Sequence, residues 1–116
     1  VAFDATDRPR PVQPAREIIE ALRGQALSMA DVATYDEGAA AADMGADLVG
    51  TTLAPDLDYA LIERLAARDI RVVAEGHVKN PAEARRCLDA GAFAVCVGTA
   101  ITRPHLLVSE FTKGIQ

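Results

Sequence analysis

The sequence predicts an α/β fold made of five consecutive parallel strand–helix units. Short apolar segments alternate with Ala-rich or amphipathic segments along the 116 residues, and no hairpin turn separates two strands. One pattern also occurs twice, in residues 26–52 and 70–99. In each copy a strand ends in a carboxylate, a helix follows, and Gly-Ala leads into a strand that ends in Gly-Thr. Parallel folds place their chemistry where strands end, so both copies are expected to face one rim.

Five short apolar segments are the expected strands. The fourth reads IRVVAE, a run typical of a strand that is buried on both faces of a parallel sheet. In chain order, the expected strands are residues 1–5, 26–31, 47–52, 70–75 and 93–98.

The first two helices have signals at both ends. A polar turn over 6–11 follows the first strand, and Pro14 suits the first turn of a helix that Gly24 can end in a left-handed conformation. Thr34 is expected to cap the second helix, which carries acids in its first turn and stops at Gly45.

The remaining helices follow in the same way. Leu recurs every fourth residue from Leu57 to Leu65, which predicts an amphipathic helix over about 57–68. Asn80-Pro81 is a cap followed by a first-turn proline, and that helix runs to Asp89. Pro104 opens a final helix toward Phe111.

Composition excludes several classes of function. The net charge is −5 and no basic cluster with interleaved aromatic residues occurs, so a nucleic-acid partner is not expected. No apolar run reaches the ~20 residues that span a membrane, and no secretion leader is expected. Cys87 and Cys96 lack metal-ligand spacing, as do His77 and His105, so we expect no metal and two buried free thiols in a reducing cytoplasm.

Two architectures contain five such units. One is a complete doubly wound sheet like that of a response-regulator receiver, and the other is five-eighths of a (β/α)8 TIM barrel. A receiver needs a phospho-acceptor Asp after its third strand and a Lys after its fifth, where this chain has Thr51-Thr52 and Gly98-Thr99. The partial barrel is therefore preferred, with residues 1–116 forming one portion of it.

Carboxylates at strand ends are the first candidate site. Asp31 and Glu75 each end an apolar strand without a basic neighbour in sequence, and together they suit orienting hydroxyls or moving a proton. Each alone is equally well explained as a helix cap. Asp4 ends the first strand, and with Thr6 and Arg8 it forms a cluster that a solvated turn would also explain.

Glycines after the last two strands predict an anion site. Gly76 and Gly98 follow successive strands, and bare glycine amides can approach a phosphate at the end of a barrel. Thr99 and Arg103 add a hydroxyl and a cation to this loop, while His77 follows Gly76 and is as well explained as a solvated residue.

These segments together resemble the N-acetylmannosamine-6-phosphate 2-epimerases. The resemblance rests on FDATDRPRP, SMADVATYDEGAAAADMGADLVGTTL, VVAEGHVKNPAEARRCLDAGAFAVCVGTAITRP and SEFTKGI. It implies the last five β/α units of a barrel and a cofactor-free epimerisation at C2 of an N-acetylhexosamine 6-phosphate in sialic-acid catabolism. It also implies catalytic roles for Glu75 and Asp31 and phosphate binding by Gly76, Gly98 and Thr99. The expected substrate contacts are Asp4, Thr6, Arg8, Thr51, Thr52, His77 and Arg103.

The resemblance also has consequences for activity. In the family the catalytic lysine lies on a strand that would precede Val1, so the 116-residue chain is expected to be inactive alone. The alternative is a non-catalytic half-barrel that binds sugar phosphate or completes its barrel with another chain, and open barrel edges favour a homo-oligomer. A different phosphate-handling barrel enzyme, such as a synthase, is disfavoured by the Asp4–Arg8 segment together with VGTAITRP.

Overall fold

The computed structural model describes residues 1–9 and 14–115 of the chain. These residues form one sheet of five parallel strands in the order β1-β2-β3-β4-β5. A receiver-type sheet would place its second strand outside its first, so the consecutive order excludes it and confirms the partial barrel. The strands are β1 (Ala2–Asp4), β2 (Met29–Asp31), β3 (Leu48–Gly50), β4 (Val72–Glu75) and β5 (Ala94–Cys96).

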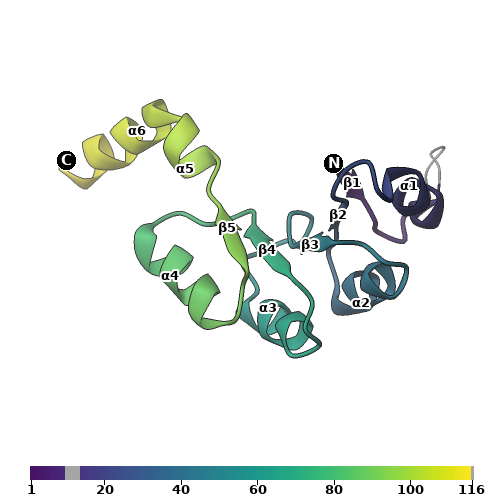
Figure 1. The fold of residues 1–116 in the computed structure, drawn as a ribbon. Coiled ribbons are helices and arrows are strands. Elements are labelled where there is room, and N and C mark those ends of the chain that lie inside the picture. The colour runs from purple at the N-terminus through teal and green to yellow at the C-terminus, as the bar shows by residue number, and fades with distance from the viewer. Residues whose placement is uncertain (10–13, 116) are drawn as a thin grey trace.

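Helices follow each strand, and Figure 1 shows α2, α3 and α4 in a row beneath the sheet. Right-handed connections between strands that advance in one direction put all their helices on one face. The helices are α1 (Ala15–Leu22), α2 (Tyr35–Asp43), α3 (Tyr59–Ala66), α4 (Pro81–Asp89), α5 (Thr99–Thr102) and α6 (Pro104–Gly114). The short α5 was not predicted, and α3 begins two residues later than its Leu pattern suggested, because Asp58 caps it.

Side-chain caps set the helix starts that the sequence predicted. The Thr34 hydroxyl accepts a hydrogen bond from the Glu37 amide at the start of α2, and the Asn80 side chain caps α4 in the same way. Gly24 and Gly45 have positive φ angles just after α1 and α2, as expected for left-handed caps. Part of the predicted turn over 6–11 lies outside the described residues.

Glu37 joins α2 to two loops. Its carboxylate accepts hydrogen bonds from the amides of Ala33 and Thr34 at 2.9 and 3.0 Å, and from the amide of Asp7 at 3.0 Å. Partial burial would raise the pKa of Glu37, but these hydrogen bonds outweigh it and lower that pKa. The carboxylate therefore stabilises the fold in its ionised form.

Replacing Glu37 by Gln is expected to lower the free energy of unfolding at pH 7 by about 1–2 kcal/mol. Because the pKa of Glu37 is lower in the folded chain, its contribution is full above the unfolded value of about 4.3 and is lost as pH falls through the folded value. Urea titrations of both proteins from pH 7 downward check this. A gap between them that widens toward acid pH would contradict it.

The core lies between the sheet and its helices. Ala30, Val49, Val72 and Ala74 point to that side from neighbouring strands and are fully buried. Ile62 and Leu65 of α3 pack into the same cluster and are also fully buried. One face of the sheet therefore carries the core.

The other face of the sheet has no element over it among the described residues. Met29, Leu48, Val73 and Ala94 alternate with the core residues, point to this inner face, and are only half-buried. The expectation that β4 is buried on both faces was therefore wrong.

The two cysteine thiols differ in exposure because the described helices cover only one face of the sheet. Cys87 lies in α4 against the core and is buried, as expected. Cys96 is exposed, contrary to expectation, because its side of β5 is the uncovered inner face.

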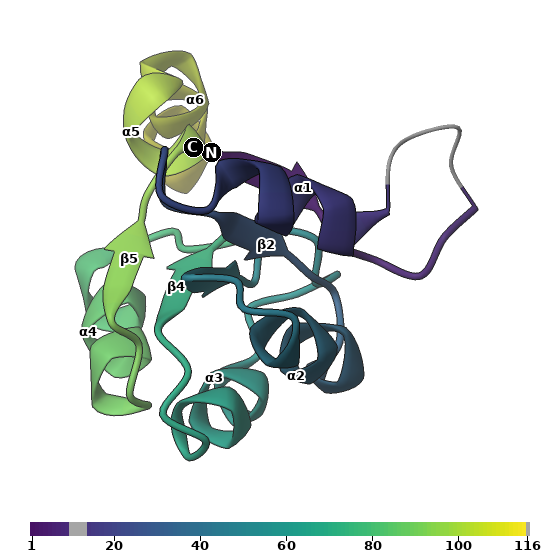
Figure 2. The ribbon, with the colours of Figure 1, turned by 45° about the vertical axis from the view of Figure 1, so that its right-hand side comes forward.

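The C-terminal helices project from the body of the molecule (Figures 1 and 2). Every described residue from Ile101 onward is exposed. The radius of gyration is 15.8 Å, whereas a compact domain of this length has about 13 Å. None of the described helices is long and apolar enough to cross a membrane.

Candidate functional site

Strand register gathers the predicted carboxylates on the inner face. Asp4 pairs with Asp31, and Asp31 pairs with Gly50. Gly50 in turn pairs with Val73, and Glu75 lies two residues further along β4 on the same side. Since side chains alternate along a strand, the carboxylates of Asp4, Asp31 and Glu75 share one face at the carboxyl end of the sheet.

Gly50 makes room for the Asp31 side chain. A Cβ atom built on Gly50 would lie 2.6 Å from Asp31 Oδ1 and 3.1 Å from Thr52 Oγ1. With no side chain at that position, Thr52 Oγ1 donates a hydrogen bond of 2.9 Å to Asp31 Oδ1. The glycine is thus part of the arrangement that holds Asp31 over β3.

Replacing Gly50 by Ala is expected to displace the Asp31 carboxylate and break its hydrogen bond with Thr52, at a cost of about 1–3 kcal/mol in stability. Thermal unfolding checks the stability, and a crystal structure of the variant checks the displacement. Gly114→Ala is the matched control, because no atom lies within 4 Å of a Cβ there. Equal stability of the two variants would contradict the prediction.

The charges of the neighbouring carboxylates affect the pKa of Asp31. Partial burial raises the pKa of Asp31, and the negative charges of Glu75 and Asp4 raise it further. The hydrogen bond from Thr52 opposes this rise without cancelling it. A carboxyl group that holds its proton more tightly than usual is suited to take up and return protons.

Thr51 holds the backbone of Glu75. Its side chain is 4% exposed, and Oγ1 accepts a hydrogen bond from the Glu75 amide and donates one to the Glu75 carbonyl, both at 3.1 Å. Both hydrogen bonds of the hydroxyl therefore link the residue after β3 to β4. Thr51 does not line the pocket, and its effect on the site is to position Glu75.

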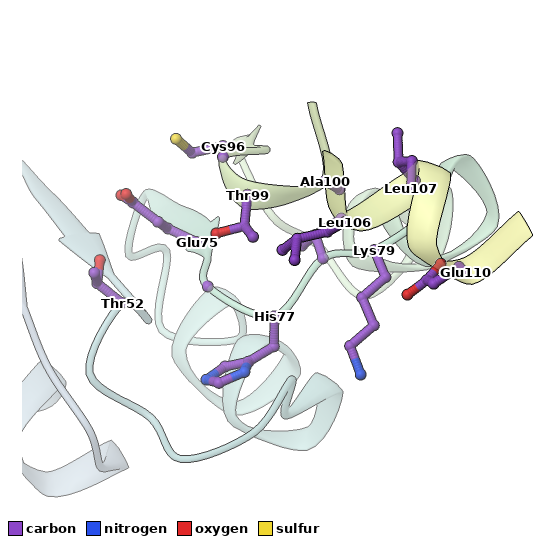
Figure 3. A pocket seen from close by; sticks show the side chains of 13 residues that line it. Thr52, Glu75, His77, Lys79, Cys96, Thr99, Ala100, Leu106, Leu107 and Glu110 are labelled. Atoms are coloured by element: carbon purple, nitrogen blue, oxygen red, sulfur yellow. The ribbon is translucent and has the colours of Figure 1, made fainter. Parts of the chain in front are cut away.

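A pocket of about 570 Å³ adjoins the rim. Six predicted site residues line it, namely Thr52, Glu75, Gly76, His77, Gly98 and Thr99. Figure 3 shows Glu75 and Thr52 reaching toward the same side, whereas Lys79 and His77 extend away from them. The pocket therefore joins the carboxyl end of β4 to the loop between β5 and α5.

Sequence reasoning missed several lining residues, namely Lys79, Cys96, Leu106, Leu107 and Glu110. Cys96 pairs in register with Glu75, so its position on the same face follows once the strands are aligned. Although Cys96 is largely exposed, the partial desolvation of its thiol raises the pKa, and the neighbouring Glu75 carboxylate adds to that rise. The sequence around Leu106, Leu107 and Glu110 does not indicate that they line the pocket, because their position depends on the direction in which α6 leaves the sheet.

The loop after β4 has an unusual backbone. Gly76 and His77 both have left-handed φ angles, of 86° and 62°. For His77 this conformation is uncommon, and its ring Nε2 lies 3.2 Å from the Ala54 carbonyl oxygen, which can only accept a hydrogen bond. The His77 ring thus ties this loop to the one after β3.

The other predicted residues lie outside the pocket. Asp4 Oδ1 accepts hydrogen bonds from the Thr6 amide at 2.9 Å and the Thr6 hydroxyl at 2.7 Å, and Arg8 forms an ion pair with Asp4 Oδ2. The polar turn thus orients Asp4. Arg103 lies exposed between α5 and α6. No group of three or more His, Cys, Asp or Glu residues within 1–9 and 14–115 is arranged to hold a metal.

Comparison with known protein families identifies the family of this chain. Residues 1–116 match the family model described as "Putative N-acetylmannosamine-6-phosphate epimerase". The chain belongs to this family. Membership agrees with the resemblance found in the sequence and with the parallel sheet of a TIM barrel.

Individual relatives agree with the family match. A relative from Caldanaerobacter subterraneus subsp. tengcongensis, described as "Putative N-acetylmannosamine-6-phosphate 2-epimerase", is 47% identical over 100 residues, covering 78% of this chain and 42% of that protein. One from Yersinia pestis with the same description is 40% identical over 124 residues, covering 100% of this chain and 53% of that protein. The chain thus spans about half the length of these epimerase-family relatives.

A solved structure shows the same fold. The N-acetylmannosamine-6-phosphate 2-epimerase from Clostridium perfringens is 37% identical, with a TM-score of 0.88 over 97% of this chain and 54% of that one. The five units therefore keep the arrangement that they have in an epimerase barrel.

Proposed function

We propose that this chain forms the carboxylate-bearing part of an enzyme that converts N-acetylmannosamine 6-phosphate to N-acetylglucosamine 6-phosphate. The observation that carries the proposal is the position of Glu75, which lines the pocket and shares the inner face with Asp31. The family membership and the names of the relatives support the choice of substrate. Such an enzyme would act in amino-sugar catabolism in the cytoplasm.

The chemistry required is a proton exchange at C2. In the open-chain sugar, the C2 hydrogen is acidic because it lies next to the C1 carbonyl. A base takes this proton, the C2–H electron pair moves into the C1–C2 bond, and the carbonyl pair moves onto the C1 oxygen to give an enolate that keeps the acetamido nitrogen on C2. Return of a proton to the opposite face of C2 inverts that centre. No step consumes a cofactor.

Glu75 and Asp31 suit the reacting end of this substrate. The Glu75 carboxylate lines the pocket and its backbone is fixed by Thr51, so it can give or take a proton at C2. Asp31, whose carboxylate is held in place by the hydrogen bond from Thr52, is suited to orient the sugar hydroxyls. The second proton-transfer group would lie on the part of the barrel that completes this face.

The phosphate would bind at the loops after β4 and β5. Gly76, Gly98 and Thr99 line that end of the pocket, and no atom lies within 4 Å of a Cβ built on Gly98. A phosphate oxygen can therefore approach the backbone closely, with the Thr99 hydroxyl beside it. Arg103 would add a positive charge from the turn before α6 if that turn closed over the loop.

Solvent deuterium exchange at C2 of N-acetylmannosamine 6-phosphate tests the proposal. The chain is expected to show no exchange alone, and to show exchange when it is fused to the part of the Clostridium perfringens epimerase that it does not cover. N-acetylmannosamine without the phosphate is the control substrate and is expected to exchange much more slowly. A soluble, folded fusion that leaves C2 unexchanged would refute the proposed activity.

A further inference from the structure

The pocket beside the rim holds a cationic side chain to which the proposed chemistry gives no role. Lys79 lies in the loop between β4 and α4 and lines this pocket. Among the described residues that line it, no other is a lysine or an arginine. Glu75 and Glu110 line the same pocket, so Lys79 is the side chain whose charge at neutral pH can attract an anion into it.

Arg103, the cation that the sequence predicted for this end of the site, does not line the pocket. It is exposed at the turn between α5 and α6. Lys79 instead lies three residues after Gly76, the first glycine of the proposed phosphate loops. It lines the pocket together with Gly98 and Thr99. A positive charge is therefore present in the wall of the pocket without any movement of α5 or α6.

The backbone at Lys79 is fixed, whereas its side chain is exposed. The Lys79 amide donates a hydrogen bond of 2.7 Å to Glu83 Oε2, and the Asn80 side chain that follows accepts one of 2.9 Å from the Glu83 amide. No ion pair within residues 1–9 and 14–115 includes Lys79. A lysine ammonium is a compact charge on a flexible stem, so it can follow a bound anion from this fixed starting point.

Lys79 is also kept apart from the reacting end of the site. Figure 3 shows its side chain extending away from Glu75. An ammonium beside Glu75 would favour the ionised carboxylate and lower its pKa, which would make Glu75 a weaker base. With the lysine pointing away, one ligand can meet Glu75 at its uncharged end and the ammonium at its anionic end.

We propose that Lys79 determines specificity for the phosphorylated sugar by pairing its ammonium with the 6-phosphate. A phosphate monoester carries about −1.5 to −2 charges at pH 7, whereas the unphosphorylated sugar offers the ammonium no charged partner. The inference rests on the proposed function for the identity of the sugar. Its own content is the residue that supplies the positive charge.

NMR titrations of the completed barrel, in which this chain is fused to the part of the Clostridium perfringens epimerase that it does not cover, test the inference. The two probes are N-acetylglucosamine 6-phosphate and N-acetylglucosamine. Lys79→Gln is expected to weaken binding of the phosphorylated probe by about three- to tenfold, the range of an exposed ion pair, and to leave binding of the other unchanged.

Two further variants separate charge from structure. Lys79→Arg keeps the charge and is expected to bind both probes as the parent barrel does. Lys113→Gln is the matched control, because it removes the same charge from an exposed residue of α6 that does not line the pocket, and it should leave both affinities unchanged. Added salt should narrow the gap between the parent and Lys79→Gln, since salt screens exposed charges.

Four results would overturn the inference. They are a folded barrel that binds neither probe, equal affinities of Lys79→Gln and Lys113→Gln for the phosphorylated probe, an equal loss for both probes, and a Lys79→Arg barrel that binds as weakly as Lys79→Gln. A barrel whose affinity depends on Lys79 but which does not exchange the C2 proton would instead refute the proposed activity and leave the role of Lys79 standing.

Discussion

Replacing Glu75 by Gln in the completed barrel is expected to lower turnover by about 10²–10⁴-fold, with a change in KM of only a few-fold. Gln keeps the size and hydrogen-bonding capacity of the side chain but cannot accept and return a proton. Glu75 lines the pocket, and Thr51 fixes its backbone, so the substitution should alter chemistry without moving the residue. Steady-state kinetics of the fusion protein give both parameters.

The control for this prediction is a Glu→Gln substitution outside the pocket. Glu63 is exposed on α3, on the helix side of the sheet, and Glu63→Gln should leave turnover and KM unchanged. If Glu75→Gln raises KM and leaves turnover intact, Glu75 binds the substrate in the ground state and has no part in moving the proton.

Leu65→Ala is expected to remove about 2–5 kcal/mol from the free energy of unfolding. Leu65 is fully buried, and its δ-methyl groups fill the space left by Gly38, where a Cβ would come within 2.9 Å of Cδ2. Gly38 has no side chain that could move into the cavity that Ala would leave there. Since small domains are stable by about 5–15 kcal/mol, this single change removes a large part of the total.

Urea unfolding followed by circular dichroism measures this loss. Leu88→Ala is the matched control, because Leu88 is 45% exposed on α4 and gives up less apolar contact. Its cost should be well below that of Leu65→Ala. Equal losses from the two variants would mean that the helix-covered face of the sheet is not the main source of stability.

Local features of the sequence predicted most of the fold. Thr34 and Asn80 were expected to cap helices, and both do, because a cap depends only on residues three positions apart. The strand-end acids were expected at one rim, and the register brings Asp4 and Asp31 side by side. The preference for a partial barrel over a receiver depends on Thr51-Thr52 and Gly98-Thr99, which stand where a receiver needs Asp and Lys, because periodicity alone does not distinguish the two architectures.

What could not be predicted depends on parts of the chain that are distant in sequence. The apolar character of β4 indicated burial on both faces, whereas its inner face is only half-buried in the part of the chain that the structure describes. Cys96 is exposed for the same reason. Lys79 and Glu110 were given no role because they come from a loop and a helix that meet only at the pocket. Thr51 and Thr52 both follow β3, and only the structure shows that Thr51 bonds the backbone of Glu75 whereas Thr52 bonds the Asp31 carboxylate.

The strand order has a consequence for synthesis. Each strand pairs with the one translated just before it, as when Met29 of β2 pairs with Leu48 of β3 and Val73 of β4 pairs with Ala94 of β5. Each of β2 to β5 therefore finds a partner that has already been translated, so each unit can add to the growing sheet as it emerges from the exit tunnel. In vectorial folding of this kind, the nascent chain keeps its newest edge unpaired for only one strand–helix unit at a time.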